Sequence, residues 1–233
     1  AIDHLYNFAA SFGNVEGPLD AMTYCRGFDY DYFINLSGQC YPIKPMDVIK
    51  EELRKRNVAY MENFRLPSKA WEGENGGLDR INCFHVRLLN LSIRIPRLNK
   101  ALPYGLEPYG GSYWFCLPKR FVDYVLDYVS NHPAIMRFYR HCRIPEEMFF
   151  QTIIMNSPLK SDVVNDDKRY IRWQKKPSPQ ILTQEDFNEI MRSDKLFARK
   201  FDINVDKTIL DLIDREIEQP RQVASSSAGL SFR

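Results

Sequence analysis

Two adjacent carboxylates, Glu146 and Glu147, follow Pro145 at the start of a predicted helix over residues 146–156. A carboxylate within hydrogen-bond reach of a hydroxyl can take its proton, so this pair suits general-base chemistry. Acidic residues are also favoured in the first turn of any helix, where the helix dipole stabilises negative charge. Taken alone, the residues favour this structural interpretation over a catalytic one.

The other reactive side chains form no strong constellation. Asp29-Tyr-Asp31 has the Asp-x-Asp pattern of many metal sites, but it precedes a predicted strand, so a solvated turn is the better interpretation. The four histidines show no metal-ligand spacing. The five scattered cysteines contain no Cys-x-x-Cys pair, and Cys40 has no histidine nearby in the sequence. They predict reduced, mostly buried thiols, as expected of a cytoplasmic protein.

Composition excludes some classes of protein. The 233 residues carry 32 Lys+Arg against 30 Asp+Glu, without the basic excess of a dedicated nucleic-acid-binding protein. No run of about 18 apolar residues predicts a transmembrane helix. Most of the 13 Tyr, 15 Phe and 3 Trp are expected in cores, and a minority could stack on sugars or bases.

The elements that must position the acids alternate between strand and helix. Strands are predicted at 31–36, 112–117 and 169–173, and helices at 45–56, from Pro118 onward, at 146–156 and at 205–217. A capping-box-like start is predicted at Thr183 and Asp186. Before the first strand, a helix at 2–12 is expected to break at Gly13-Asn14 and Gly17-Pro18, with a second at 19–26.

This alternation predicts an α/β domain with a largely parallel central sheet flanked by helices. Sites in such sheets lie at the carboxyl ends of the strands. Three loops are therefore expected at the site: residues 37–42, the region after Leu117 and the segment after Trp173.

Three sequence blocks, taken together, carry a resemblance. They are Phe33-Ile-Asn-Leu-Ser-Gly-Gln-Cys-Tyr-Pro-Ile-Lys44; Gly110-Gly-Ser-Tyr-Trp-Phe-Cys-Leu117 with Pro145-Glu-Glu-Met-Phe-Phe150; and Leu196-Phe-Ala-Arg-Lys-Phe-Asp202. With Arg169-Tyr-Ile-Arg-Trp173, this order and spacing resembles the core-2/I-branching glycosyltransferases (family 14). That family includes β-1,6-N-acetylglucosaminyltransferases and peptide O-xylosyltransferases.

The resemblance implies a GT-A-like fold and an inverting transfer from a nucleotide sugar. Its general base corresponds to Glu147, while Glu146 would cap or orient. It also implies a metal-free design with no cofactor, in which basic side chains stabilise the leaving diphosphate. Lys200 matches the diphosphate-binding lysine, with Arg199 as a weaker companion. The second basic group falls in register near Lys176.

The same resemblance assigns further contacts. Ser37 and Gly38 would form the donor loop, although Cys40 stands where many relatives have an acid. Trp173 matches an aromatic that lines the acceptor site, with a core position as the equal alternative. Ser112 could touch the acceptor, and Trp114 is expected in the core.

The expected organisation is a single transferase domain over residues 1–218 and a flexible tail over 219–233. The family's domain begins with a β-α-β unit that holds the nucleotide, and none is predicted before Phe33. The amino-terminal part of the domain is therefore expected to be missing from these residues.

The predicted function is transfer of N-acetylglucosamine or xylose from a UDP-sugar to a hydroxyl of a glycan, lipid-linked glycan or protein. The cysteine pattern favours a cytoplasmic, bacterial enzyme of polysaccharide synthesis, and peripheral association with the inner face of the membrane stays open. The alternative is a non-catalytic carbohydrate- or nucleotide-binding module on the same fold. Nucleic acid is disfavoured as a partner, because the charge is near neutral and basic and aromatic residues do not interleave.

Overall fold

The computed structural model describes residues 8–71, 75–88, 91–173 and 178–218. The chain divides into two compact units. Unit 1 comprises Ala1–Ser37 and Lys50–Arg169, and unit 2 comprises Gly38–Ile49 and Tyr170–Arg233. The assignment of one domain to residues 1–218 stays a prediction, and the predicted tail at 219–233 lies outside the described residues.

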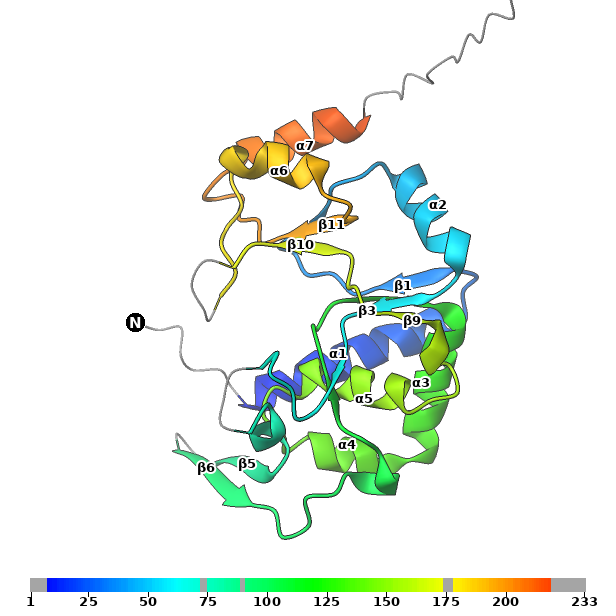
Figure 1. The fold of residues 1–233 in the computed structure, drawn as a ribbon, viewed down its shortest axis with the longest axis vertical. Coiled ribbons are helices and arrows are strands. Elements are labelled where there is room, and N and C mark those ends of the chain that lie inside the picture. Colours follow the sequence, from blue (N-terminus) through cyan, green and yellow to red (C-terminus); the bar gives the residue numbers. More distant parts are fainter. Residues whose placement is uncertain (1–7, 72–74, 89–90, 174–177, 219–233) are drawn as a thin grey trace, which may run out of the picture. The chain divides into compact units, whose positions relative to one another are not determined.

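The described elements mix helices and short strands (Figure 1). The helices are α1 (Phe8–Cys25), α2 (Met46–Arg56), α3 (Lys119–Asn131), α4 (Pro133–Tyr139), α5 (Phe149–Met155), α6 (Phe187–Arg192) and α7 (Thr208–Glu218). The strands are β1 (Tyr32–Ile34), β2 (Cys40–Pro42), β3 (Ala59–Met61), β4 (Phe64–Arg65), β5 (Cys83–Leu88), β6 (Leu91–Pro96), β7 (Tyr109–Gly110), β8 (Phe115–Pro118), β9 (Val163–Val164), β10 (Arg169–Ile171) and β11 (Phe197–Arg199). The mixed α/β prediction is confirmed.

The main sheet of unit 1 has the order β1-β8-β3-β9. Strand β8 runs antiparallel to both β1 and β3, whereas β3 and β9 are parallel. Three strands therefore share one direction, but only one of the three ladders is parallel, so the prediction of a largely parallel sheet is wrong. The alternation of strand and helix does orient β1 and β3 alike. It could not show that β8, more than fifty residues later, inserts between them.

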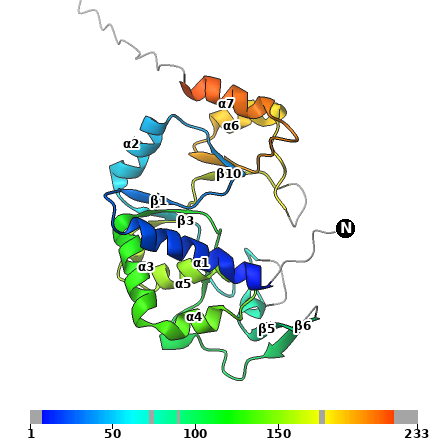
Figure 2. The ribbon, with the colours of Figure 1, turned by 180° about the vertical axis from the view of Figure 1, so that it is seen from behind.

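Helices α1, α3 and α5 form a layer against this sheet (Figures 1 and 2). Helix α3 is amphipathic and buries Phe121, Val122 and Val125, and α5 is buried along most of its length. These side chains pack with Phe115 and Leu117 of β8 in one apolar core. The predicted helices at 45–56 and from Pro118 are confirmed by α2 and α3.

Helix α1 runs unbroken through Gly13, Gly17 and Pro18, so the predicted break is wrong. A proline inside a helix removes one hydrogen bond and crowds the preceding turn, which is why the sequence favoured two helices. The continuous helix buries four apolar side chains on one face: Phe12, Val15, Leu19 and Met22. Full burial of one such side chain is worth about 1.5–3 kcal/mol, so four together outweigh the local penalty.

Unit 2 contains a three-stranded sheet of order β10-β11-β2, in which β11 and β2 are antiparallel. Helices α6 and α7 pack on each other, and their buried residues Ile190, Ile209 and Ile213 share a core with Ala198 and Phe201. The capping-box-like start before α6 is confirmed, because the main-chain N–H of Thr183 donates to the Asp186 carboxylate at 2.9 Å.

All five cysteines are free, and Cys83, Cys116 and Cys142 are buried. Burial raises the pKa of the Cys142 thiol to about 12, which makes it a poor nucleophile. Within the described ranges, no helix is both long and apolar enough to cross a bilayer.

Candidate active site

One edge of the unit 1 sheet gathers polar side chains. Asn35 follows β1, Glu62 follows β3 and Asp167 lies just beyond β9, so all three stand at the carboxyl ends of strands that share a direction. The amide of Asn35 donates to the main-chain oxygen of Tyr113 at 2.9 Å, which brings the start of the β8 segment to the same edge. The region after Leu117, expected at the site, therefore lies at the opposite edge because β8 is antiparallel.

Glu147 lies close to the segment that leads into β8, where main-chain and side-chain hydrogen bonds hold it. It ends a 3-10 turn (Pro145–Glu147) that leads into α5. The main-chain N–H of Gly111 donates to its carbonyl oxygen at 3.0 Å, and Arg80 Nη1 donates to its Oε2 at 2.6 Å. Its side chain is 34% exposed, so the carboxylate remains accessible. Among the described residues, Oε1 has no hydrogen-bond partner.

The neighbouring acid has a different environment. Glu146 is only 8% exposed, and its Oε1 accepts a hydrogen bond from Asn14 Nδ2 of α1 at 3.0 Å. The two acids that looked alike in the sequence are thus one buried structural group and one accessible carboxylate.

Arg80 and Trp71 complete the surroundings of Glu147, and neither was predicted from the sequence. The guanidinium carbon of Arg80 lies 3.6 Å from the centre of the Trp71 ring. The indole fits between two glycines, because a Cβ on Gly77 or Gly110 would stand 2.2 or 2.5 Å from its ring atoms. The sequence signal for this arrangement was two pairs of adjacent glycines, because a residue without a Cβ lets a large ring approach the backbone closely.

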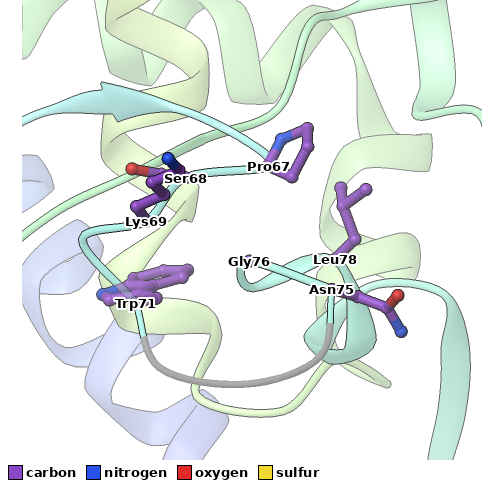
Figure 3. A pocket seen from close by; sticks show the side chains of 7 residues that line it. All are labelled: Pro67, Ser68, Lys69, Trp71, Asn75, Gly76 and Leu78. Carbon is purple, nitrogen blue, oxygen red and sulfur yellow. The ribbon is translucent and has the colours of Figure 1, made fainter.

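Trp71 also borders an open pocket of about 500 Å³ (Figure 3). The other lining residues come from the two arms of the same loop region: Pro67, Ser68, Lys69, Asn75, Gly76 and Leu78. The same indole therefore belongs both to a solvent-accessible pocket and to the stack on Arg80.

Glu62 is another acid at this edge, and it interacts electrostatically with Asp167 and Glu147. Its residue surface is exposed, yet the protein atoms around its carboxyl remove part of its hydration and raise its pKa. The negative charges of Asp167 and Glu147 raise the pKa of Glu62 further, while the main-chain N–H of Ser112 opposes the shift by hydrogen bonding to the carboxylate. The predicted residue Ser112 thus lies beside the Glu62 carboxylate, and the residue before it, Gly111, hydrogen-bonds to the main chain of Glu147.

In unit 2, Lys200 directly follows β11. Its carbonyl accepts the main-chain N–H of Leu182 at 2.8 Å, and the next N–H, from Phe201, donates to Gln39 at 3.0 Å. Phe201 is buried in the unit 2 core, so the main chain at Lys200 is fixed. Among the described residues, the Lys200 ammonium has no ion-pair partner.

The predicted donor loop runs next to this lysine. Arg199 stands opposite Cys40 in the β11–β2 ladder, which places Gly38 two residues from that pair. Gly38 is exposed, and a Cβ added there would contact nothing within 4 Å. The structure thus brings Gly38, Arg199 and Lys200 together, while Ser37 ends unit 1.

Comparison with known proteins identifies the family of the chain. A family model described as Core-2/I-Branching enzyme matches residues 21–191, well over half of the chain. The chain belongs to the core-2/I-branching enzyme family. The resemblance predicted from the sequence blocks is therefore confirmed.

Relatives of this chain carry the name xylosyltransferase. Xylosyltransferase 2 of Mus musculus is 28% identical over 210 residues, which cover 81% of this chain and 23% of that protein. Xylosyltransferase 1 of Homo sapiens is 29% identical over 205 residues, covering 79% and 21%. The chain thus spans less than a quarter of the length of these relatives.

The remaining predicted residues of this core-2/I-branching chain are placed as follows. Trp173 is 54% exposed, so its core alternative is wrong, whereas Trp114 is 6% exposed and its core prediction is confirmed. Lys176 lies outside the described residues. Asp31 of the Asp-x-Asp pattern ion-pairs with Arg54 at 2.5 Å on the surface. The described residues contain no group of three or more His, Cys, Asp or Glu side chains that could hold a metal.

Gly111 links the β8 segment to Glu147, and we expect Gly111→Ala to be strongly destabilising. A Cβ at this position would stand 2.0 Å from the main-chain oxygen of Glu62, so the backbone must shift. Overpacking of this kind costs about 1–3 kcal/mol. The free energy of unfolding, measured by urea titration, should fall by about that amount.

Gly13→Ala is the matched control for this change. Gly13 lies inside α1, and an added Cβ would meet nothing within 4 Å. Replacing a helical glycine by alanine should stabilise the chain by about 0.5–1 kcal/mol. Equal effects of the two alanines would contradict the close approach of Gly111 to Glu62.

Proposed function

We propose that this chain is an inverting glycosyltransferase that moves a sugar from a UDP-sugar to an acceptor hydroxyl, with Glu147 as general base and no metal. The observation that carries the proposal is the accessible Glu147 carboxylate in a chain that belongs to the core-2/I-branching family. A carboxylate with a free oxygen can receive the hydroxyl proton as the new bond forms.

The proposed donor is UDP-xylose or UDP-N-acetylglucosamine, taken up without a cofactor. The names of the relatives favour xylose. Lys200, with Arg199 and Lys176 as companions, would stabilise the negative charge that develops on the leaving diphosphate. Among the described residues the Lys200 ammonium has no ion-pair partner, which supports this proposal. Asp31 of the Asp-x-Asp pattern is paired with Arg54, which also supports it.

The proposed acceptor is a glycan, a lipid-linked glycan or a protein hydroxyl. Trp173, exposed on unit 2, offers an aromatic face to the apolar side of a sugar ring, and Ser112 offers a polar contact beside Glu147 in unit 1. The alternative, a non-catalytic binding module, would use the same donor loop without turnover.

A donor screen tests the proposal. The full chain would be incubated with UDP-xylose or UDP-N-acetylglucosamine and with glycan or serine-containing peptide acceptors, in EDTA or in manganese. UDP release and product mass would be measured, and donor binding followed by thermal shift. Transfer in EDTA supports the proposal. A rate that appears only with manganese overturns the metal-free part, and donor binding without transfer to any acceptor favours the module.

A further inference from the structure

We propose that Arg80 and Trp71 are positioning residues, which fix the Glu147 carboxylate so that Oε1 is the oxygen that takes the acceptor proton. This inference rests on the proposed function, since it assigns a task to residues around the proposed base. It goes beyond that proposal by naming the atom and the side chains that orient it.

The first support is the contact between Arg80 and Glu147. The 2.6 Å hydrogen bond is charge-assisted and joins residues 67 positions apart in the sequence. The Arg80 side chain is 17% exposed, so solvent screens this pair less than a surface pair. With Oε2 engaged by Nη1, Oε1 is the oxygen left to accept a proton.

The second support is the rigidity of Arg80 itself. It ends a 3-10 turn (Leu78–Arg80), and its N–H donates to Gly77 at 3.2 Å. Its carbonyl accepts the N–H of Arg143 at 3.0 Å. The main chain of Arg80 is therefore fixed by hydrogen bonds through both its N–H and its carbonyl.

The third support is the flat face on which the guanidinium rests. Arg80 stacks on Trp71, which is fixed between Gly77 and Gly110 and packs edge-on against Phe64 at 5.2 Å. A guanidinium can stack through its face while its in-plane N–H groups donate to a carboxylate. An ammonium cannot combine these two geometries, so lysine is expected to replace arginine only in part.

In the proposed step, each bond that forms is matched by a bond that breaks. The acceptor oxygen forms a bond to the anomeric carbon as the bond from that carbon to the diphosphate oxygen breaks. The bonding electron pair leaves with UDP, and the hydroxyl proton passes to Oε1 of Glu147. A carboxylate that rotates freely would spend part of its time with neither oxygen aimed at the hydroxyl. Misplacement by about 1 Å can cost about 100-fold in rate.

Two variants, Arg80→Met and Arg80→Lys, test whether Arg80 positions the base or only stabilises the fold. We expect kcat to fall about 100-fold in Arg80→Met, by analogy with such misplacement, with an intermediate loss in Arg80→Lys. The KM for the UDP-sugar and the donor-induced thermal shift should stay near wild type, because the donor is not what Arg80 holds. A fall in donor affinity at unchanged kcat would overturn the inference.

Trp71 provides a second pair of variants. Trp71→Phe keeps an aromatic face for the guanidinium and should retain more of kcat than Trp71→Leu, which removes it. If Trp71→Phe and Trp71→Leu remain folded by circular dichroism and have equal kcat values, Trp71 is not a positioning residue.

The matched control is Arg26→Met. Arg26 forms an ion pair of the same length, 2.6 Å, with Asp127 in the same unit. It should leave kcat unchanged, and an equal loss in Arg26→Met would attribute the Arg80 effect to general destabilisation. Glu147→Gln separates the two proposals. If it is inactive while Arg80→Met keeps full kcat, the positioning fails and the base stands; if wild type shows no transfer, the proposed function fails.

Discussion

Glu147→Gln is expected to lower kcat by about 10²–10⁴-fold, the range for loss of a general base. The amide has nearly the same shape as the carboxylate, but it cannot take the hydroxyl proton at neutral pH. The Arg80 contact to Oε2 can persist, since an amide oxygen also accepts a hydrogen bond. The site should therefore keep its geometry and lose only its chemistry. Initial rates of UDP release and product formation at saturating donor and acceptor measure this effect.

Glu146→Gln is the control, because Glu146 is the neighbouring acid in the chain but has a different environment. Glu146 is buried and accepts from Asn14, a contact that glutamine can retain. We expect this variant to remain active. The opposite pattern, activity lost in Glu146→Gln and kept in Glu147→Gln, would move the base assignment to the buried acid. Thermal unfolding of both variants would show whether either loss reflects unfolding.

Lys200→Ala is expected to lower kcat by about 10²–10³-fold, as for removal of one group that stabilises charge in a transition state. The main chain at Lys200 is held by hydrogen bonds to Gln39 and Leu182 on either side, and these do not depend on the side chain. The fold should thus be unaffected, and UDP should bind more weakly. Steady-state kinetics in EDTA and calorimetry with UDP measure the two effects.

Lys207→Ala serves as the matched control for the loss of one positive charge. Lys207 is exposed in the same unit, just before α7, and has no part in the proposed site. It should leave both kcat and UDP affinity unchanged. A loss in Lys200→Ala confined to KM would mean that the lysine contributes equally to ground-state and transition-state binding, which contradicts selective stabilisation of the leaving group.

The sequence predicted well the features that depend on local patterns. Amphipathic spacing and a leading proline located α2 and α3, and the Thr183–Asp186 pair located the start of α6. Such signals arise within one or two turns of chain, so they can be recognised without knowing what packs against them. The assignment of Glu147 as base came instead from the resemblance carried by blocks spread over the chain, and it is a proposal.

The predictions that failed concern contacts distant in sequence. The local break at Gly17-Pro18 was outweighed by burial of one face of α1 in a core built from later segments. The direction of β8 follows from its neighbours β1 and β3, and not from its own residues. Arg80 was missed for the same reason, because its partner lies 67 residues away.

The position of Trp71, between Gly77 and Gly110 and against Arg80, has a spectroscopic consequence. The chain has three tryptophans, of which Trp114 is buried and Trp173 is largely exposed. Trp71 carries a cation, the Arg80 guanidinium, against its ring. Because a nearby charge shifts the energy of the indole excited state, a variant that keeps Trp71 as its single tryptophan has a built-in fluorophore beside the proposed base. Its emission wavelength would report displacement of Arg80 when a ligand enters, without an added dye.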